Sequence, residues 1–487
     1  MSADARPFAT LPTALYIGGQ WHDASDGART EVLDPATDAV IAEVANATPE
    51  DGLRAVDAAA AAATDWASTP ARERAEILRR SYESMIDHRD DLATLIALEG
   101  GKSRRDAEGE VNYAAEFFRW FAEEAVRGTG HVQRAPGGDK NILTVLQPVG
   151  VSILITPWNF PAAMATRKIG PALAAGCTVV LKPAPETPLT ALAVAHLMEE
   201  AGLPPGVVNV VTSSRSGPVV SAMMEHTATR KISFTGSTEV GRILLTQAAD
   251  KVLNCSMELG GNAPFIVFAD ADLDAAVEGA MIAKMRNAGE SCIAANRFLV
   301  AEEVVDEFAE RLAAQMSVLK VGSGADASNQ VGPMINGAAC ADIAAMVQRS
   351  VDAGAKLLVG GAPREGAGNF FEPTVLTSVA GDDPILSQEI FGPVAPVASF
   401  STEDEAVALA NDTPFGLAAY VFTGDLARAL RVAERVDAGM VGVNRGFISD
   451  PAAPFGGVKQ SGLGREGGHE GLLEFLEAKY IAVDWGA

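Results

Sequence analysis

Residues 150–184, GVSILITPWNFPAAMATRKIGPALAAGCTVVLKPA, contain two short apolar runs separated by a longer alanine-rich segment. The runs at 150–156 and 177–182 have the length and β-branched content of buried strands, and the segment 161–176 is long enough for a helix. A strand, a helix and a second strand in this order form the crossover unit of a parallel sheet. The stretch therefore predicts an α/β fold.

The same alternation continues on both sides of this stretch. Long amphipathic helices are predicted at 50–67 and 71–101, and shorter helices at 187–202 and 216–226. Further strands of the first series are predicted at 207–212 and 231–235. A second series of strands follows at 264–268, 297–301, 394–400 and 418–423, again with helices between them. Two successive series of this kind predict two α/β domains.

Two segments fall outside the alternation. Residues 132–150 hold two β-prone runs around a Pro-Gly-Gly-Asp turn, which predicts a hairpin, and EAKYIAVDW near the C-terminus predicts one more strand. These strands either complete a sheet on a neighbouring subunit or form local edge strands.

Acidic residues dominate the charge of the chain. It has 63 Asp and Glu against 38 Lys and Arg over 487 residues, a formal net charge of −25. A field of this sign repels nucleic acid and anionic membrane surfaces, so neither is an expected partner. Residues 141–166 carry no charge, but three prolines interrupt them, which predicts a strand and loop rather than a membrane span.

The cysteines and histidines indicate a reducing compartment and no metal. Four cysteines without a CxxC pair do not make a disulfide framework, so we expect a cytoplasmic protein. The six scattered histidines have no metal-ligand spacing, and no metal site is expected. The first 21 residues lack a basic start followed by an apolar run and predict no signal peptide.

Three glycine patterns are candidates for phosphate binding. GLGREG at 462–467 has no clear strand before it, and GSGADA at 322–327 follows a helix. FTGSTEVGR at 234–242 differs, because it follows a predicted strand and opens a predicted helix. Free amides at such a helix start can hold a pyrophosphate, although an ordinary glycine turn that caps a helix has the same pattern.

Three polar residues suggest carbonyl chemistry. Cys292 lies in NAGESCIAANR, where small neighbours let a substrate approach the sulfur; a buried, inert cysteine is the alternative. Asn159 lies in TPWNFP, where two prolines fix its amide either as an oxyanion donor or as part of a rigid packing loop. Glu258 has an apolar setting that suits a base with a raised pKa or a buried ion pair.

Together these stretches resemble the aldehyde dehydrogenase superfamily over nearly the whole chain. TPWNFP, VVLKPA, FTGSTEVG, MELGGNAPFIVF, NAGESC, SQEIFGPV and PFGGVKQSGLGREGG occur in the order and spacing of that family. The resemblance implies a Rossmann-like NAD(P)-binding domain at 1–131 and 151–258 and an α/β catalytic domain at 259–474. It also implies a β-hairpin oligomerisation flap at 132–150 and 475–487, and with it a homodimer or homotetramer.

The resemblance assigns roles to the three polar residues. Cys292 corresponds to the nucleophile, Glu258 to the base that activates water, and Asn159 with the Cys292 backbone amide to the oxyanion hole. The implied reaction begins with addition of the thiolate to an aldehyde. Hydride transfer to the nicotinamide then leaves a thioester, and water releases the acid.

The resemblance also implies the cofactor contacts. Lys182 would reach the adenosine ribose, Ser237 the pyrophosphate, and Glu389 with Phe391 the nicotinamide end. The other residues expected at the cofactor site are Thr156, Pro157, Trp158, Asn159, Pro185, Gly236 and Leu259.

The expected cofactor is NADP in preference to NAD. NAD-preferring relatives commonly place Glu three residues after the lysine that corresponds to Lys182, and here that position is Pro185, with Glu186 displaced by one. Without a carboxylate at 185 a 2′-phosphate meets less repulsion, and Lys182 can pair with it.

Within the family the chain most resembles the succinate-semialdehyde dehydrogenases. Arg167, Arg286 and Ser449 stand where that subfamily binds the distal carboxylate of its substrate, although surface or interdomain salt bridges are an alternative for the arginines. Two positions depart from the subfamily: Arg445 replaces a common Glu, and Ala294 replaces the second active-site cysteine of some members.

Other functions remain to be weighed against succinate semialdehyde oxidation. Glutarate semialdehyde has one more methylene, which a pocket discriminates by only about 1–3 kcal/mol, and a broader aliphatic aldehyde dehydrogenase is also possible. A CoA-acylating enzyme would not need Glu258 to activate water. A catalytically inactive structural protein would not need Cys292, Glu258 and Asn159 together.

Overall fold

The strand–helix–strand unit predicted at 150–184 is present in the computed structural model, which describes residues 11–484. Its elements are β7 (Val151–Ile155), α5 (Pro161–Ala175) and β8 (Val179–Lys182), and the two strands pair in parallel. Proline at the first helical position suits the start of α5, and the left-handed Gly176, with φ 97°, ends it. The prediction of an α/β fold is confirmed.

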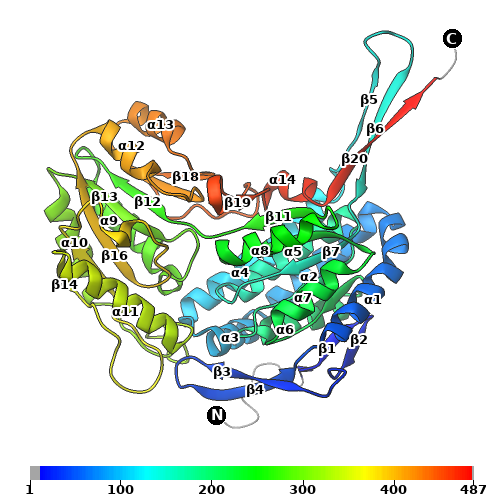
Figure 1. The fold of residues 1–487 in the computed structure, drawn as a ribbon, viewed down its shortest axis with the longest axis horizontal. Helices are drawn as coiled ribbons and strands as arrows, with labels where there is room; N and C mark the ends of the chain where they lie inside the picture. The colour runs from blue at the N-terminus through cyan, green and yellow to red at the C-terminus, as the bar shows by residue number, and fades with distance from the viewer. Residues whose placement is uncertain (1–10, 485–487) are drawn as a thin grey trace.

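This unit lies at the middle of an eight-stranded sheet (Figure 1). The order is β19 (Gly462–Leu463), β11 (Asn254–Glu258), β10 (Thr229–Thr235), β7, β8, β9 (Val208–Val210), β1 (Leu15–Ile17) and β2 (Gln20–His22). The strands from β11 to β9 are parallel, and β19, β1 and β2 add antiparallel edges.

Helices cover both faces of this first sheet. Alternate residues of each strand point to opposite faces, so Leu154 and Leu181 pack into one core and Ile153 and Val180 into the other. The first core contains α2 (Ala71–Asp87), α3 (Arg89–Gly100), α4 (Arg104–Glu124), α5 and α6 (Pro188–Glu200). The second contains α1 (Pro49–Ser68), α7 (Ser216–Glu225) and α8 (Thr238–Ala249).

A seven-stranded sheet forms the second unit. Its order is β14 (Lys356–Val359), β15 (Thr374–Thr377), β16 (Val394–Phe400), β13 (Ala295–Ala301), β12 (Ala263–Val267), β17 (Ala418–Phe422) and β18 (Met440–Val443). One face packs on α9 (Leu273–Met285) and α10 (Val305–Ser317). The other packs on α11 (Gly337–Asp352), α12 (Glu403–Asn411) and α13 (Leu426–Arg435). All four strands predicted for the second series are present.

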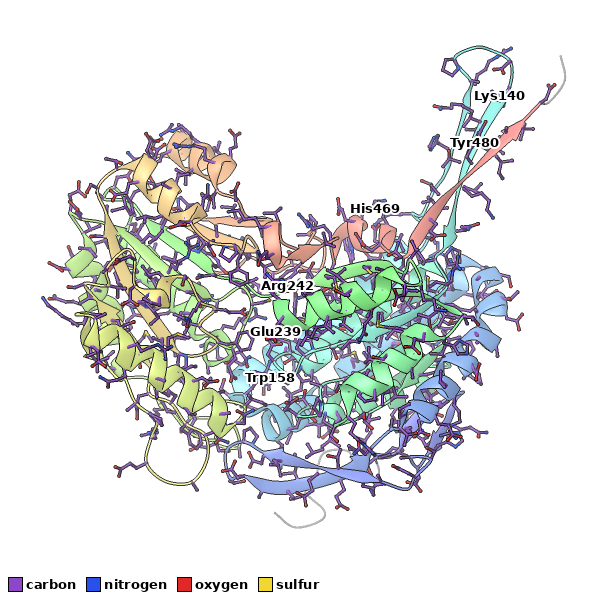
Figure 2. The ribbon with its side chains drawn as sticks, in the orientation of Figure 1. Lys140, Trp158, Glu239, Arg242, His469 and Tyr480 are labelled. Carbon is purple, nitrogen blue, oxygen red and sulfur yellow. The ribbon has the colours of Figure 1, made fainter. Side chains whose placement is uncertain are left out.

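A three-stranded sheet projects from the body of the molecule (Figure 1). The predicted hairpin is present as β5 (His131–Arg134) and β6 (Asn141–Pro148), and the predicted C-terminal strand, β20 (Leu476–Val483), pairs with β6 along its whole length. Lys140 and Tyr480 mark this flap in Figure 2. A short antiparallel ribbon of β3 (Arg29–Asp34) and β4 (Ala39–Ala45) and the helix α14 (Gly468–Leu473) lie outside these three sheets.

The structure differs from the sequence prediction in two places. The single long helix predicted at 71–101 is two helices, because the chain turns at His88, which joins α2 to α3. The expected division at residue 259 assigns Gly462–Leu463 to the catalytic domain, yet these residues pair with β11 at the edge of the first sheet. A strand of two residues leaves no periodic pattern to detect. The domain boundaries themselves stay a prediction.

Some predictions fall partly outside the described chain. Residues 1–10 and 485–487 are not described, so the ends of the expected ranges 1–131 and 475–487, and much of the N-terminal segment, lie outside it. Between residues 11 and 484 no helix is long and apolar enough to cross a membrane.

Candidate active site

The residues predicted for catalysis and binding meet at one cavity of about 410 Å³. The carboxyl ends of the parallel strands of the first sheet face it, which is where open α/β sheets bind ligands. Trp158, just after β7, lies between the two α/β units (Figure 2). The predicted residues on the wall are Thr156, Pro157, Trp158, Asn159, Arg167, Lys182, Pro185, Gly236, Ser237, Leu259, Arg286, Cys292, Glu389, Phe391 and Ser449. Glu258 directly precedes wall residue Leu259 but does not itself line the cavity.

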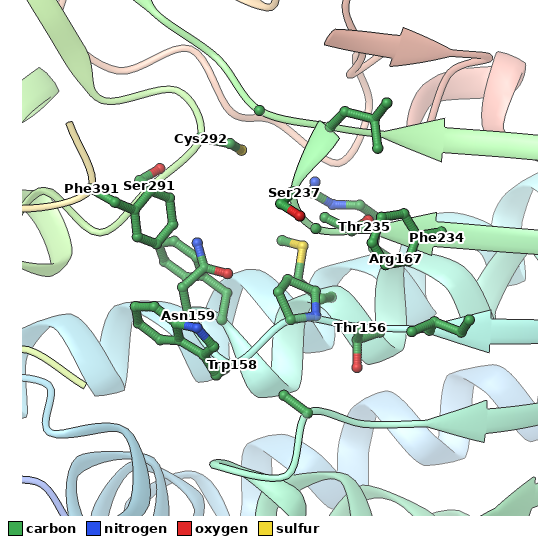
Figure 3. A pocket seen from close by; sticks show the side chains of 18 of the residues that line it. Thr156, Trp158, Asn159, Arg167, Phe234, Thr235, Ser237, Ser291, Cys292 and Phe391 are labelled. Atoms are coloured by element: carbon green, nitrogen blue, oxygen red, sulfur yellow. The ribbon is translucent and has the colours of Figure 1, made fainter. Parts of the chain in front are cut away.

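A left-handed turn leads from α9 to Cys292. Asn287, Ala288 and Gly289 have φ values of 53°, 53° and 79°. Such a backbone is costly for residues with a Cβ and persists only where the surroundings hold it. At Gly289 a Cβ would lie 2.2 Å from the carbonyl oxygen of Gly392, so only glycine fits there. This turn directs the Cys292 side chain into the cavity (Figure 3).

Hydrogen bonds from three directions hold this turn. Asp106 on α4 accepts from the Asn287 backbone N–H at 3.1 Å. The Asn287 side-chain amide donates to the carbonyl oxygens of Asn159, at 3.2 Å, and Glu290, at 2.9 Å. The Asn159 amide donates to the same Glu290 oxygen at 3.0 Å. The loops that carry Asn159 and Cys292 are therefore fixed to each other.

Asn159 retains hydrogen-bonding capacity for a ligand. Its side chain is buried, and the hydrogen bond to Glu290 uses one of its two amide N–H groups. Its Oδ1 has no partner among the described residues. In Figure 3 this amide lies in the same cavity as Cys292. The second N–H is thus available to an oxygen that approaches the sulfur.

The environment of Cys292 favours the protonated thiol. Burial raises its pKa to about 12; Arg167 opposes this rise, and Glu389 and Glu258 add to it. The exposed thiol of a free cysteine has a pKa near 8.5, so the environment suppresses the thiolate rather than favouring it. A base must therefore take the proton as the sulfur attacks.

Glu258 is a buried carboxyl without a partner. It ends β11, and neither carboxyl oxygen has a hydrogen bond among the described residues. Burial raises its pKa well above the ordinary value, and the nearby Glu466 adds to the rise. This direction agrees with the prediction of a carboxyl with a raised pKa. The alternative of an ion pair is not found between residues 11 and 484, since no basic group lies within 4 Å of this carboxyl.

Arg167 lies partly in the cavity and partly in a buried ion pair. Its Nη1 is 3.5 Å from Glu466, and its Nη2 donates to the Tyr113 hydroxyl at 2.7 Å. The guanidinium lies 4.1 Å from the centre of the Phe455 ring. Glu466 also accepts from Lys168 at 2.5 Å. Arg167 thus forms the salt bridge that was the alternative interpretation, and it also lies on the cavity wall.

Arg286 has an aromatic environment instead. Its guanidinium lies 4.8 Å from the ring centres of both Phe160 and Phe447 and 5.8 Å from that of Tyr113. No carboxylate of the described chain lies within 4 Å of it. Ser449 is buried and lines the same cavity. The two arginines and the serine therefore lie on the wall of the cavity that also carries Cys292.

The opposite end of the cavity lies at β8 and α8. Burial lowers the pKa of Lys182, the last residue of β8, to about 8, and Glu186 opposes this. Ser237 caps α8, accepting from the Val240 N–H at 3.3 Å. The buried hydroxyls of Thr156 and Thr235 have no partner among the described residues. A cation, free helix amides and unpaired hydroxyls suit a phosphate-bearing ligand.

Glu389 and Phe391 lie between the two ends. Phe391 packs edge-on against Trp158, with ring centres 5.4 Å apart, and both rings appear beside the cavity in Figure 3. Glu389 accepts from the Gly261 N–H at 3.1 Å, and burial raises its pKa to about 7. At Gly261 a Cβ would lie 2.2 Å from the Cys292 carbonyl oxygen, so glycine permits this close approach.

Several residues of the site escaped the sequence analysis. Tyr113, Phe160, Phe455, Ile293 and Ser216 line the cavity, and Glu466 lies behind it. Glu466 belongs to the GLGREG segment that was recognised only for its glycines. Tyr113 lies on α4, and no local pattern distinguishes it from other helical aromatic residues.

Comparison with known proteins agrees with this geometry. A model of the aldehyde dehydrogenase family matches residues 21–481. The chain is 56% identical over 444 residues to a succinate-semialdehyde dehydrogenase of Paenarthrobacter nicotinovorans, covering 91% of this chain and 99% of the relative. It is 50% identical over 468 residues to a glutarate-semialdehyde dehydrogenase of Pseudomonas putida, covering 96% and 97%. The crystal structure of an Escherichia coli NADP dependent enzyme, 48% identical, superposes with a TM-score of 0.96 over 97% of this chain and 98% of that one.

The chain belongs to the aldehyde dehydrogenase family and is an aldehyde-oxidising enzyme. Among its relatives at about half identity are dehydrogenases of four- and five-carbon semialdehydes.

Proposed function

We propose that the enzyme oxidises succinate semialdehyde to succinate with NADP or NAD as hydride acceptor. The observation that carries the proposal is Arg286, a cation on the cavity wall with no carboxylate of the described chain within 4 Å. A half-buried guanidinium without an anionic partner favours an anionic ligand. Cys292 lines the same cavity and would receive the aldehyde end.

The relatives support an anionic semialdehyde as the substrate, but they do not distinguish between two chain lengths. Succinate and glutarate semialdehyde differ by a methylene, and relatives named for each are similarly close to this chain. We favour succinate semialdehyde because the relative at 56% identity bears that name. Oxidation of glutarate semialdehyde, or of a broader set of aliphatic aldehydes, remains the second candidate.

The side chains support the following sequence of steps. Cys292 Sγ bonds to the aldehyde carbon and releases its thiol proton to water in the cavity, so Glu258 stays ionised for the later hydrolysis. The oxyanion that forms accepts from the Asn159 amide and the Cys292 backbone N–H. A nicotinamide cofactor held beside Cys292 by Glu389 and Phe391 would supply the hydride acceptor for that carbon, and loss of the hydride would leave a thioester on Cys292. Ionised Glu258 then takes a proton from water, whose oxygen displaces the sulfur and releases the carboxylic acid.

The cavity wall fits the cofactor that this reaction needs. Lys182, Ser237 and the first amides of α8 would hold the phosphates and the adenosine ribose, and the unpaired Thr156 and Thr235 hydroxyls offer further contacts. Glu389 and Phe391 would hold the nicotinamide end beside Cys292.

We expect the enzyme to prefer NADP over NAD. Position 185 is proline, so no carboxylate stands there to repel a 2′-phosphate, and Lys182 lies on the wall to pair with it. Among residues 11–484, Glu186 is the acidic group whose charge raises the pKa of Lys182. The measurement is kcat/KM for both cofactors at saturating aldehyde.

Variants at positions 185 and 186 sharpen this test. Pro185→Glu should shift the preference toward NAD by about tenfold or more, while Glu186→Gln should leave NADP preferred. A wild-type kcat/KM for NAD about tenfold or more above that for NADP would refute the prediction.

Removal of Arg286, the proposed binding partner of the substrate carboxylate, should affect only anionic substrates. Arg286→Ala should lower kcat/KM for succinate semialdehyde about ten- to a hundredfold, because a charge-assisted hydrogen bond is worth roughly 1.5–3 kcal/mol. The loss should appear mainly in KM if Arg286 binds ground state and transition state equally. Butanal, which has no carboxylate, should be a poor substrate and nearly indifferent to the change.

One further variant is a control, and a second tests the other arginine of the cavity wall. Arg445→Ala removes a nearby exposed arginine outside the cavity wall and should have little effect on either substrate. Arg167→Ala should also lower kcat/KM for succinate semialdehyde, but this variant breaks the ion pair with Glu466 as well. Equal losses on both aldehydes in Arg286→Ala would show that this arginine is structural.

The assembly and the location of the enzyme stay predictions. We propose that the flap joins subunits in a homodimer or homotetramer, since Val132 and Tyr480 on its strands are 62% and 56% exposed. A cytoplasmic setting is expected from the cysteine content alone.

A further inference from the structure

Lys284 is a fully buried cation that the proposed steps do not use. It lies in the last turn of α9, two residues before Arg286, and is 0% exposed. Its Nζ donates to the Asn296 side-chain oxygen at 3.2 Å and to the Ile390 carbonyl oxygen at 3.4 Å. Burial lowers the pKa of Lys284 to about 7, and Glu389 opposes this. A lysine is expensive to bury, so its position calls for an explanation.

The hydrogen bonds of Lys284 lead to Glu389 along two routes. Ile390 directly follows Glu389, so the bond to its carbonyl fixes the backbone beside that carboxylate. On the other route, the Asn296 amide donates to the Gly261 carbonyl at 3.4 Å, and the Gly261 N–H donates to Glu389 at 3.1 Å. Lys284 thus connects α9, β13, the loop after β11 and the segment that carries Glu389.

The charge of Lys284 also acts on Glu389. Burial raises the pKa of Glu389 to about 7, while the Gly261 N–H and Lys284 both lower it. Among the described residues, Cys292 also interacts electrostatically with Glu389, and burial favours the neutral form of its thiol. Lys284 is therefore the cation that favours the carboxylate form of Glu389.

We propose that Lys284 is a positioning residue for the cofactor, which keeps Glu389 ionised and fixes its backbone so that the carboxylate can accept hydrogen bonds from the nicotinamide ribose hydroxyls. This inference rests on the proposed function, since it takes Glu389 to be a cofactor contact. Lys284 itself does not line the cavity, so it would act on the cofactor only through Glu389.

The test is the pH dependence of cofactor binding without aldehyde, measured by isothermal titration calorimetry with NADP. In the wild type, affinity should fall as the pH falls through about 7, because Glu389 gains a proton there. Lys284→Met removes the cation, which raises the pKa of Glu389, so the fall should begin at higher pH. Near neutral pH the variant should bind NADP about tenfold more weakly.

Two controls separate this effect from general destabilisation. Lys231→Met removes another fully buried lysine with a lowered pKa, which bonds to Asn254 and Ser256 away from the cavity, and it should leave the pH profile unchanged. In the Glu389→Gln background, Lys284→Met should have little further effect, because the group it acts on is no longer titratable.

The outcomes distinguish the inference from the proposed function. If Glu389→Gln weakens NADP binding but Lys284→Met shifts neither affinity nor pH profile, the inference is wrong and the cofactor site stands. If Glu389→Gln has no effect on NADP binding, Glu389 is not a cofactor contact, and the role inferred for Lys284 is wrong with it. Should Lys284→Met not fold, Lys284→Gln, which removes the charge but keeps an N–H donor, takes its place, and a pH profile of NADP binding unchanged from the wild type in that variant would overturn the inference.

Discussion

Cys292→Ala is expected to abolish aldehyde oxidation. The proposed reaction passes through a bond between Sγ and the substrate carbon, and no other thiol of the described chain lines the cavity. Loss of a catalytic nucleophile lowers turnover by about four orders of magnitude or more in enzymes of this kind. The measurement is steady-state formation of reduced cofactor, together with NADP binding to show that the variant is folded.

The other three cysteines are matched controls for this variant. Cys177 and Cys340 are buried and donate to backbone carbonyls, and Cys255 lies on β11 outside the cavity. Alanine at each should leave kcat within a few-fold of the wild type. Substantial activity in Cys292→Ala would exclude the thioester route.

Glu258→Gln should separate the two halves of the reaction. Acylation and one hydride transfer should still occur, but without a base the thioester should hydrolyse very slowly. Stopped-flow absorbance should show a burst of reduced cofactor followed by turnover about 10²- to 10⁴-fold slower than in the wild type. A variant without a burst would mean that Glu258 is already needed for attack by the Cys292 thiol.

The pH profile gives a second readout for Glu258. Burial raises its pKa, so the carboxyl is protonated at lower pH and acts as a base only as the pH rises through that raised value. Wild-type deacylation should therefore slow as the pH falls. Glu99→Gln is a matched control, because Glu99 is a buried carboxyl with a pKa near 8 that binds the backbone at the start of α6, away from the cavity. It should keep the wild-type profile, and an undiminished steady-state rate in Glu258→Gln would contradict the role of Glu258.

The fold was largely predictable because its signal is local. The apolar runs at 150–156 and 177–182 and the helix between them appear in the structure nearly as predicted, since short apolar strands and alanine-rich helices have distinct patterns. The break at His88 was not predicted, because the residues on both sides of it favour a helix. Pairing of Gly462–Leu463 with β11 is set by tertiary contacts alone.

Only the site residues that lie in recognisable sequence motifs were predictable. Cys292, Asn159 and Arg286 stand in short segments with recognisable composition, and they line one cavity. The pKa of Cys292 was not predictable, because the burial that raises it comes from segments far apart in the chain. Glu466 and Lys284 were missed for the same reason: their contacts with Arg167 and Ile390 exist only after the chain has folded.

The pairing of β20 with β6 bears on how the chain folds during its synthesis. Tyr480 lies opposite Thr144, and β19 adds the last strand beside β11 of a sheet whose other members come from the first 258 residues. The N-terminal unit can therefore collapse early on its parallel strands, but one edge of its sheet and one of β6 stay open until the ribosome has made nearly the whole chain. Open strand edges recruit other strands, and contacts between distant residues form slowly. The interval before the C-terminal segment arrives is thus when the nascent chain is most prone to aggregate and most in need of a chaperone.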